Sequence, residues 1–169
     1  MVVDVRPGVP ADIEGASRCV DVVARERAYI GFLEGPALEQ SRSFWTPLIK
    51  QELPYIVAAD GAAIVGWCDV VPVPRPIFAH IGTLGMGLWP AYRSQGVGTR
   101  LMALAIEASR ASGLERVELA VFADNQRARR LYAKMGFTVE STRPRRAKMD
   151  GRYRDEVLMA LVLKAPASE

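Results

Sequence analysis

A strand, a glycine-containing loop and an amphipathic helix follow one another between residues 82 and 112, and this unit restricts the folds open to the chain. The loop contains Gly96 and Gly98, with Arg93 just ahead of them. The helix, Thr99–Ser112, carries its apolar residues on one face and ends at Gly113. Bare backbone N–H groups that converge at a helix N-terminus favour a bound anion, most often a phosphate.

Of three other interpretations of the loop, the sequence excludes the first and leaves two open. A P-loop requires Lys followed by Ser or Thr after the second glycine, and Thr99 and Arg100 stand there instead. A dinucleotide-binding loop requires a third glycine where Leu101 lies, although Glu118 follows Gly98 by about 20 residues, as an acidic ribose ligand would. A helix-start turn without any ligand is the third possibility.

Composition and charge exclude several broad classes. The 169 residues are 50% hydrophobic and carry a formal net charge of +3, which fits one globular domain and gives no argument for a nucleic-acid partner. Charges interrupt every apolar run, so we expect no membrane span and no secretory signal. Two cysteines and one histidine predict no metal site and a cytoplasmic protein with reduced thiols.

The remaining pattern predicts one α/β domain over residues 1–163 and a frayed tail over 164–169. Residues 31–53 contain two glycines and two prolines among apolar residues and predict a short helix or two between loops. The expected strands are Val2–Arg6, Tyr55–Ala59, Ala63–Val71, Gly82–Trp89, Arg116–Phe122, about Thr138–Arg146 and Asp155–Leu163. The other expected helices run from Pro10 to about Ala28 and from Asp124 or Asn125 to Met135.

A second motif follows the Arg116–Phe122 strand. Together, Arg93-x-x-Gly96-x-Gly98 and the segment NQRARRLYAKMGF resemble the two signature motifs of the GNAT acetyltransferase superfamily. The second motif is matched at Asn125, Ala128, Leu131, Tyr132, Gly136 and Phe137. Within the superfamily, the C-terminal region with its Asp-Gly-x-Tyr run at 150–153 looks most similar to bacterial enzymes that acetylate amino acids or related small amines.

The resemblance implies a mixed sheet of about seven strands with about four helices, splayed between its central strands to admit acetyl-CoA. Acetyl-CoA is then the co-substrate, and no metal takes part. Main-chain groups of Met86 and Leu88 would hold the pantetheine arm, and Asn125 would bond to it. Arg130 would reach the 3′-phosphate. The pyrophosphate would meet the loop residues Arg93, Ser94, Gln95, Gly96, Val97, Gly98 and Thr99.

Tyr132 matches the general acid of the family, which protonates the departing CoA thiolate. Helical spacing puts Asn125, Ala128 and Tyr132 on one face and turns Leu131 and Met135 to the core. A core aromatic with a satisfied hydroxyl is the alternative role for Tyr132.

The general base is not given by the motif. Where some relatives carry glutamate, this chain has Gly82 and Ala120, which cannot take a proton. His80 has the strand parity of Gly82 and a suitable intrinsic pKa, so it is the candidate base; a strand-end histidine without a role is the alternative. Glu118 and Asp69 are further candidates.

A weak base favours an acceptor whose amine is readily deprotonated. An α-amino group has a pKa of about 8, against about 10.4 for a lysine side chain. We therefore expect an N-acetyltransferase that acts on the α-amine of a free amino acid or related small amine, by direct attack in a ternary complex. A protein N-terminal acetyltransferase and a non-catalytic acyl-CoA-binding or regulatory domain are the alternatives. Enzymes of this kind are usually homodimers.

Overall fold

The computed structural model describes residues 2–163, so the expected tail at 164–169 lies outside the described residues. The helices are α1 (Ile13–Arg25), α2 (Leu38–Lys50), α3 (Val97–Ala111) and α4 (Gln126–Lys134), with short 3-10 turns η1 (Pro10–Asp12), η2 (Pro76–Phe78) and η3 (Pro90–Tyr92). The strands are β1 (Asp4–Pro7), β2 (Tyr55–Asp60), β3 (Ala63–Pro72), β4 (Ile81–Leu88), β5 (Arg116–Phe122), β6 (Thr138–Met149) and β7 (Arg152–Val162).

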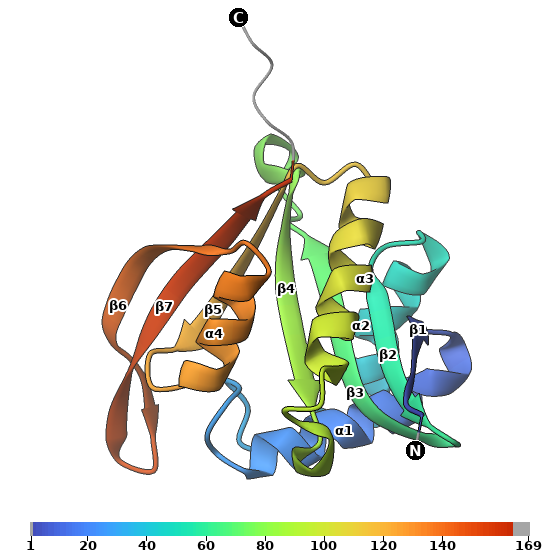
Figure 1. Ribbon diagram of the computed structural model, residues 1–169, viewed down its shortest axis with the longest axis horizontal. Coiled ribbons are helices and arrows are strands. Elements are labelled where there is room, and N and C mark those ends of the chain that lie inside the picture. The colour runs from blue at the N-terminus through green and yellow to red at the C-terminus, as the bar shows by residue number, and fades with distance from the viewer. Residues whose placement is uncertain (1, 164–169) are drawn as a thin grey trace, which may run out of the picture.

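All seven strands form one mixed sheet in the order β1-β2-β3-β4-β5-β7-β6 (Figure 1). The parallel pair β4–β5 lies at its centre, and the other neighbouring pairs are antiparallel. β4 and β5 pair only from Ile81 to Thr83 and from Arg116 to Glu118. Beyond Thr83 the two strands diverge, and Figure 1 shows the gap widening towards the end of β4. The predicted splay is therefore present.

Helices cover both faces of the sheet. The face under α3 and α4 buries one cluster, in which Ile56 and Ala58 of β2 pack with Leu101 and Met102 of α3. The opposite face buries a second cluster under α1 and α2, to which β2 contributes Tyr55, Val57 and Ala59. Because successive side chains of a strand point to opposite faces, β2 reads as an unbroken apolar run.

The glycines of β4 leave room for side chains of β3. A Cβ on Gly87 would lie 2.3 Å from Cη2 of Trp67, and a Cβ on Gly82 would lie 2.4 Å from Cγ1 of Val70. Both distances are far below a van der Waals contact. Packing against β3 alone therefore excludes a side chain at Gly82 and Gly87.

Helix α2 is longer than the glycines and prolines of residues 31–53 suggested. It runs for 13 residues with Pro47 inside it. Ser41, Trp45 and Leu48 are buried at helical spacing against the sheet and α1, so packing offsets the hydrogen bond that Pro47 cannot donate.

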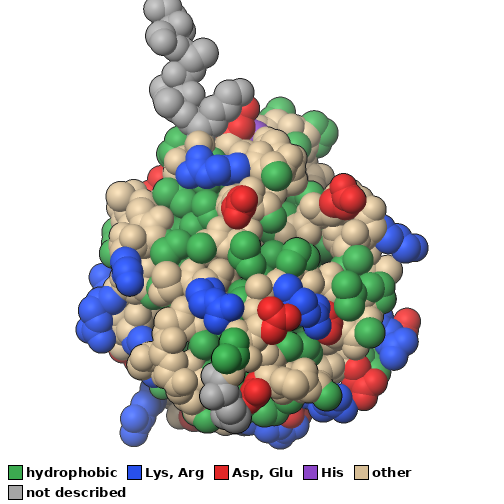
Figure 2. All heavy atoms as spheres, turned by 45° about the vertical axis from the view of Figure 1, so that its right-hand side comes forward, with side chains coloured by type: hydrophobic (Ala, Val, Ile, Leu, Met, Phe, Trp, Pro, Cys, Tyr) green, Lys and Arg blue, Asp and Glu red, His purple; other side chains and the backbone are tan. Residues whose placement is uncertain are grey.

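Charges of both signs are interspersed with apolar side chains on the face shown in Figure 2. Within residues 2–163, no helix combines the length and apolar character needed to cross a membrane.

Gly87→Ala tests the packing of β4 on β3. We expect the clash with the Trp67 ring to lower the free energy of unfolding by about 1–3 kcal/mol. Gly31→Ala is the control, because no atom lies within 4 Å of the added methyl group and Gly31 has no positive φ. Urea denaturation of the two variants measures the difference, and equal stability would contradict the packing account.

Candidate functional site

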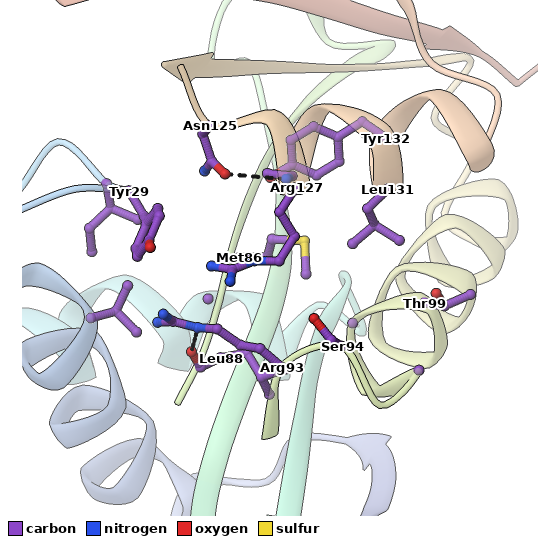
Figure 3. Close-up of a pocket in the computed structure, with 16 residues that line it drawn as sticks. Tyr29, Met86, Leu88, Arg93, Ser94, Thr99, Asn125, Arg127, Leu131 and Tyr132 are labelled. Carbon is purple, nitrogen blue, oxygen red and sulfur yellow. Dashed lines mark hydrogen bonds between the residues drawn. The ribbon is translucent and has the colours of Figure 1, made fainter. Parts of the chain in front are cut away.

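A cavity lies beside the open edge of β4, where α4 faces the loop that precedes α3 (Figure 3). It combines residues of the two sequence motifs with residues from the segment between α1 and α2. Its lining comprises Val23, Tyr29, Ile30, Met86, Gly87, Leu88, Arg93, Ser94, Gly96, Gly98, Thr99, Asn125, Arg127, Ala128, Leu131 and Tyr132.

The loop backbone is shaped to present N–H groups at the start of α3. Gly96 is the N-cap of the helix, with φ of 81°, and Ser94 has φ of 61°. A positive φ is uncommon outside glycine, so Ser94 marks a constrained turn. The first N–H groups of a helix have no intrahelical acceptor, and the helix dipole adds partial positive charge there. This loop is suited to binding an anion.

Gly98 allows the first turn of α3 to approach α4 closely. A Cβ at this position would lie 3.2 Å from Cδ2 of Leu131 and 3.7 Å from Cε of Met86. Met135 packs against the core as predicted. Leu131 is also packed against the core, but it lines the cavity as well, which helical spacing alone did not predict.

The guanidinium of Arg93 is engaged by other groups of the protein, which the motif did not predict. Its Nε donates to the carbonyl oxygen of Leu88 at 2.8 Å, and its Nη1 donates to Oε2 of Glu26 at 2.8 Å. Its side chain is only 12% exposed. Arg93 therefore ties the loop both to the end of β4 and to the residue that follows α1.

Two guanidinium groups lie close to the ring of Tyr29 at the edge of the cavity. The Cζ atoms of Arg93 and Arg127 are 4.9 and 5.1 Å from the centre of its ring. Both distances are in the range of cation–π contacts. The sequence analysis missed Tyr29 and Arg127, because neither belongs to the motif matches and only the fold brings residue 29 to α4.

Asn125 caps helix α4 and is one of the two residues at which the sequence predicted the helix to begin. It is the N-cap of α4, and its Oδ1 accepts a hydrogen bond from the N–H of Ala128 at 3.2 Å. The residue is 9% exposed and lines the cavity. Capping uses the oxygen, so the Nδ2 donors stay available to a ligand.

Tyr132 is buried on the cavity side of α4, with 8% of its surface exposed. Burial raises the pKa of its hydroxyl, and the nearby Cys68 thiol adds to the rise. The group is therefore a neutral phenol around pH 7 and holds a proton that it can donate. Tyr132 lines the cavity together with Met86 of β4 and Thr99 of α3 (Figure 3).

Four residues of the predicted site do not line the cavity, and neither do the two further base candidates Asp69 and Glu118. Val97 is buried in the core, and the exposed Gln95 donates through its side chain to the carbonyl oxygen of Ala91. Arg130 is exposed on α4 and does not line the cavity. His80 is exposed ahead of β4, six positions before Met86, and its carbonyl oxygen accepts from the N–H of Glu115. At about 3.3 Å per residue, that spacing puts His80 roughly 20 Å from the cavity end of β4, so the geometry does not support it as the base.

The arrangement combines an unpaired strand edge, an anion-binding helix N-terminus and a buried phenol. An unpaired edge can hydrogen-bond an extended chain that carries amides. The described residues contain no group of three or more His, Cys, Asp or Glu side chains that could hold a metal ion.

Comparison with known proteins identifies the family. A profile of the acetyltransferase (GNAT) family matches residues 23–137. The L-amino acid N-acetyltransferase AaaT of Escherichia coli (strain K12) is 33% identical over 124 residues, which are 73% of this chain and 74% of that enzyme. The chain therefore belongs to the acetyltransferase (GNAT) family, and it is an acyltransferase.

Solved structures confirm the predicted fold. An acetyltransferase of the GNAT family from Streptococcus pneumoniae superimposes with a TM-score of 0.87 at 27% identity, over 95% of this chain and 99% of that one. The putative acetyltransferase yncA from Salmonella typhimurium, solved with its cofactor acetyl-CoA, gives a TM-score of 0.92 at 19% identity, over 100% and 98% of the two chains.

Arg127→Ala tests which cation of α4 serves the anion site. Arg127 lines the cavity and Arg130 does not, so we expect the Arg127 variant to bind acetyl-CoA about 10–100-fold more weakly. Arg130→Ala, which removes the same charge from the same helix, should bind within about threefold of the unmodified protein. Isothermal titration calorimetry measures both, and the reverse order would assign the site to Arg130.

Proposed function

We propose that the protein transfers the acetyl group of acetyl-CoA to the α-amine of a free amino acid or a related small amine, by direct attack in a ternary complex. One observation carries the proposal: the open edge of β4 leads directly to the N-terminus of α3, with Tyr132 facing the same cavity. A thioester with a long amide-containing arm and a pyrophosphate fits this arrangement: the arm matches the strand edge, and the pyrophosphate matches the helix N-terminus.

The residues of the cavity divide the binding of acetyl-CoA between them. Main-chain groups of Met86 and Leu88 would pair with the pantetheine amides, as in the addition of a strand to a sheet edge. The loop from Ser94 to Thr99 would hold the pyrophosphate through its N–H groups. Arg127 would supply the free cation, because the guanidinium of Arg93 is already paired with Glu26.

Acetyl-CoA supplies the acyl group as a thioester, and Tyr132 would assist its release. The phenol would give its proton to the sulfur as the C–S bond breaks. Its raised pKa suits this function, because the group arrives protonated at each turnover.

The segment between α1 and α2 supports a small acceptor. Nη1 of Arg154 donates to the carbonyl oxygen of Ala28 at 2.8 Å, and Nη2 pairs with Asp124. Arg27 pairs with Asp150 in the turn between β6 and β7. These contacts fix the segment, which lines the cavity through Tyr29 and Ile30. A fixed segment at the cavity favours a small acceptor over a protein N-terminus, which would need an open groove. The similarity to the L-amino acid N-acetyltransferase AaaT supports the same acceptor class.

A non-catalytic acyl-CoA-binding domain would share the cavity but would not need the phenol of Tyr132.

We also propose a cytoplasmic homodimer. Cys19 and Cys68 are buried free thiols, which supports a reducing compartment. Light scattering of the purified protein tests the dimer.

Tyr132→Phe removes the proposed acid and keeps the ring. We expect kcat to fall by about 10²–10⁴-fold, because the thiolate then leaves without a proton. The melting temperature and the Kd for acetyl-CoA should stay close to those of the unmodified protein. Turnover within a few-fold of normal would remove Tyr132 from the mechanism.

Steady-state CoA release at saturating acetyl-CoA tests the function. The acceptor panel contains amino acids, polyamines, aminoglycosides and short peptides. We expect free amino acids or related α-amines to be the preferred acceptors. A preference for polyamines or peptides would overturn the acceptor class, and tight acetyl-CoA binding without any turnover would favour the non-catalytic alternative.

A further inference from the structure

Asp69 is a buried carboxylate that is anchored through only one of its oxygens. It lies in the middle of β3 and is 4% exposed. Nε1 of Trp45, from α2, donates to Oδ2 at 3.0 Å. Trp45 stacks on Tyr55 of β2, with ring centroids 5.2 Å apart, so the donor is itself fixed in position. The indole therefore orients the carboxylate.

The second oxygen faces β4 at a point where that strand has no side chain. Asp69 pairs with Gly85 across the β3–β4 ladder, and a Cβ on Gly85 would lie 3.3 Å from Oδ1. Within residues 2–163, no hydrogen bond reaches Oδ1, yet the oxygen is not fully shielded from solvent. Gly85 is partly exposed and Thr83, two positions earlier on the same face, is exposed. Because Gly85 has no side chain, one water molecule beside β4 would be enough to connect Oδ1 with an acceptor.

This position lies across β4 from Tyr132. Trp67, Asp69 and Tyr55 point to the face of the sheet that α1 and α2 cover, whereas Tyr132 and Met86 belong to the cluster on the opposite face. Gly85 is the residue directly before Met86, whose main chain we assign to the pantetheine. An acceptor at Oδ1 would thus meet the thioester from the side opposite the acid.

Among residues 2–163, no cation interacts with Asp69 to favour its ionised form. Burial raises its pKa to about 7, and the hydrogen bond from Trp45 opposes the rise. The titratable groups that interact with it are the phenol of Tyr55 and the thiol of Cys68, and burial raises the pKa of each, so both are neutral around pH 7. A base with a pKa near the working pH is the most effective.

Glu118, the other carboxylate that the sequence analysis named as a candidate base, forms an ion pair with Arg116. Glu118 accepts from Nε of Arg116 at 2.7 Å, and its side chain is 42% exposed. The ion pair with Arg116 already engages this carboxylate at the protein surface.

We propose that Asp69 is the general base, a function that rests on the proposed acetyl transfer. Oδ1 takes one proton from the acceptor ammonium, directly or through one water, and later releases it to solvent. The freed nitrogen lone pair attacks the thioester carbon, the C–N bond forms and the C–S bond breaks. Tyr132 protonates the sulfur, and the second proton lost by the nitrogen restores the phenol. The products are an amide and a CoA thiol, with one proton released.

Asp69→Asn tests the base while keeping an oxygen that can accept from Trp45. We expect kcat/KM for the preferred amino acid to fall about 10²–10⁴-fold, with the Kd for acetyl-CoA unchanged. The ascending limb of the pH profile, near pH 7 in the unmodified enzyme, should move up to the pKa of the acceptor amine. The loss should also shrink for amino acid amides, whose amines have a lower pKa. Activity within about threefold of normal, with the same limb, would overturn the proposal.

Trp45→Phe provides a second test that does not depend on the stability of the Asp69 variant. Without the indole donor the buried carboxylate loses the interaction that lowers its pKa. The base must be ionised to act, so the ascending limb of kcat/KM should move to higher pH, and an unmoved limb would contradict the proposal.

If the unmodified protein acetylates no acceptor in the panel, both the proposed function and the proposed base are wrong. If the unmodified protein is active and both variants keep its pH profile, only the base is wrong.

Discussion

The early divergence of β4 from β5 is the constraint on which the site depends. The parallel ladder covers three residue pairs, and among the described strands none pairs with the rest of β4 on that side. Unpaired main-chain groups in a protein interior are unfavourable unless water or a ligand satisfies them. The free edge also points at the N-terminus of α3, so one extended ligand can pair with the strand and place an anion on the helix.

Packing keeps this edge open and accessible. Gly87 and Gly82 let β4 lie against the side chains of β3, while α3 and α4 approach each other through Gly98 and Leu131. The two arginines beside Tyr29 differ in their function. Arg93 pairs with Glu26 and the end of β4, whereas Arg127 has its guanidinium in the cavity. One arginine fixes the loop, and the other is free to meet an anion.

The sequence predicted the parts of the fold that depend on local pattern. β5 has the predicted bounds, Arg116–Phe122, because its apolar alternation is uninterrupted. The motifs also predicted Met86, Gly98 and Tyr132 as neighbours in the cavity. The extent of α2 was not predictable, because Pro47 breaks the local signal and only the burial of Trp45 and Leu48 stabilises the helix.

Contacts between distant segments limited the prediction of the site. Glu26 is 67 positions from Arg93, and no spacing rule connects them. Tyr29 has no motif around it, and His80 satisfied strand parity without reaching the cavity. The environment of Asp69 depends on Trp45, 24 positions away on another element, and on the absence of a side chain at Gly85.

Amide hydrogen exchange with and without acetyl-CoA tests the central claim most directly. If the open edge of β4 and the N-terminus of α3 hold one extended ligand, acetyl-CoA should slow exchange at residues 86–88 and 96–99 together. The edge strand β6, at the far side of the sheet, should be unaffected. Tight binding that protects neither segment, or protects the α3 loop without β4, would contradict a ligand held along the strand.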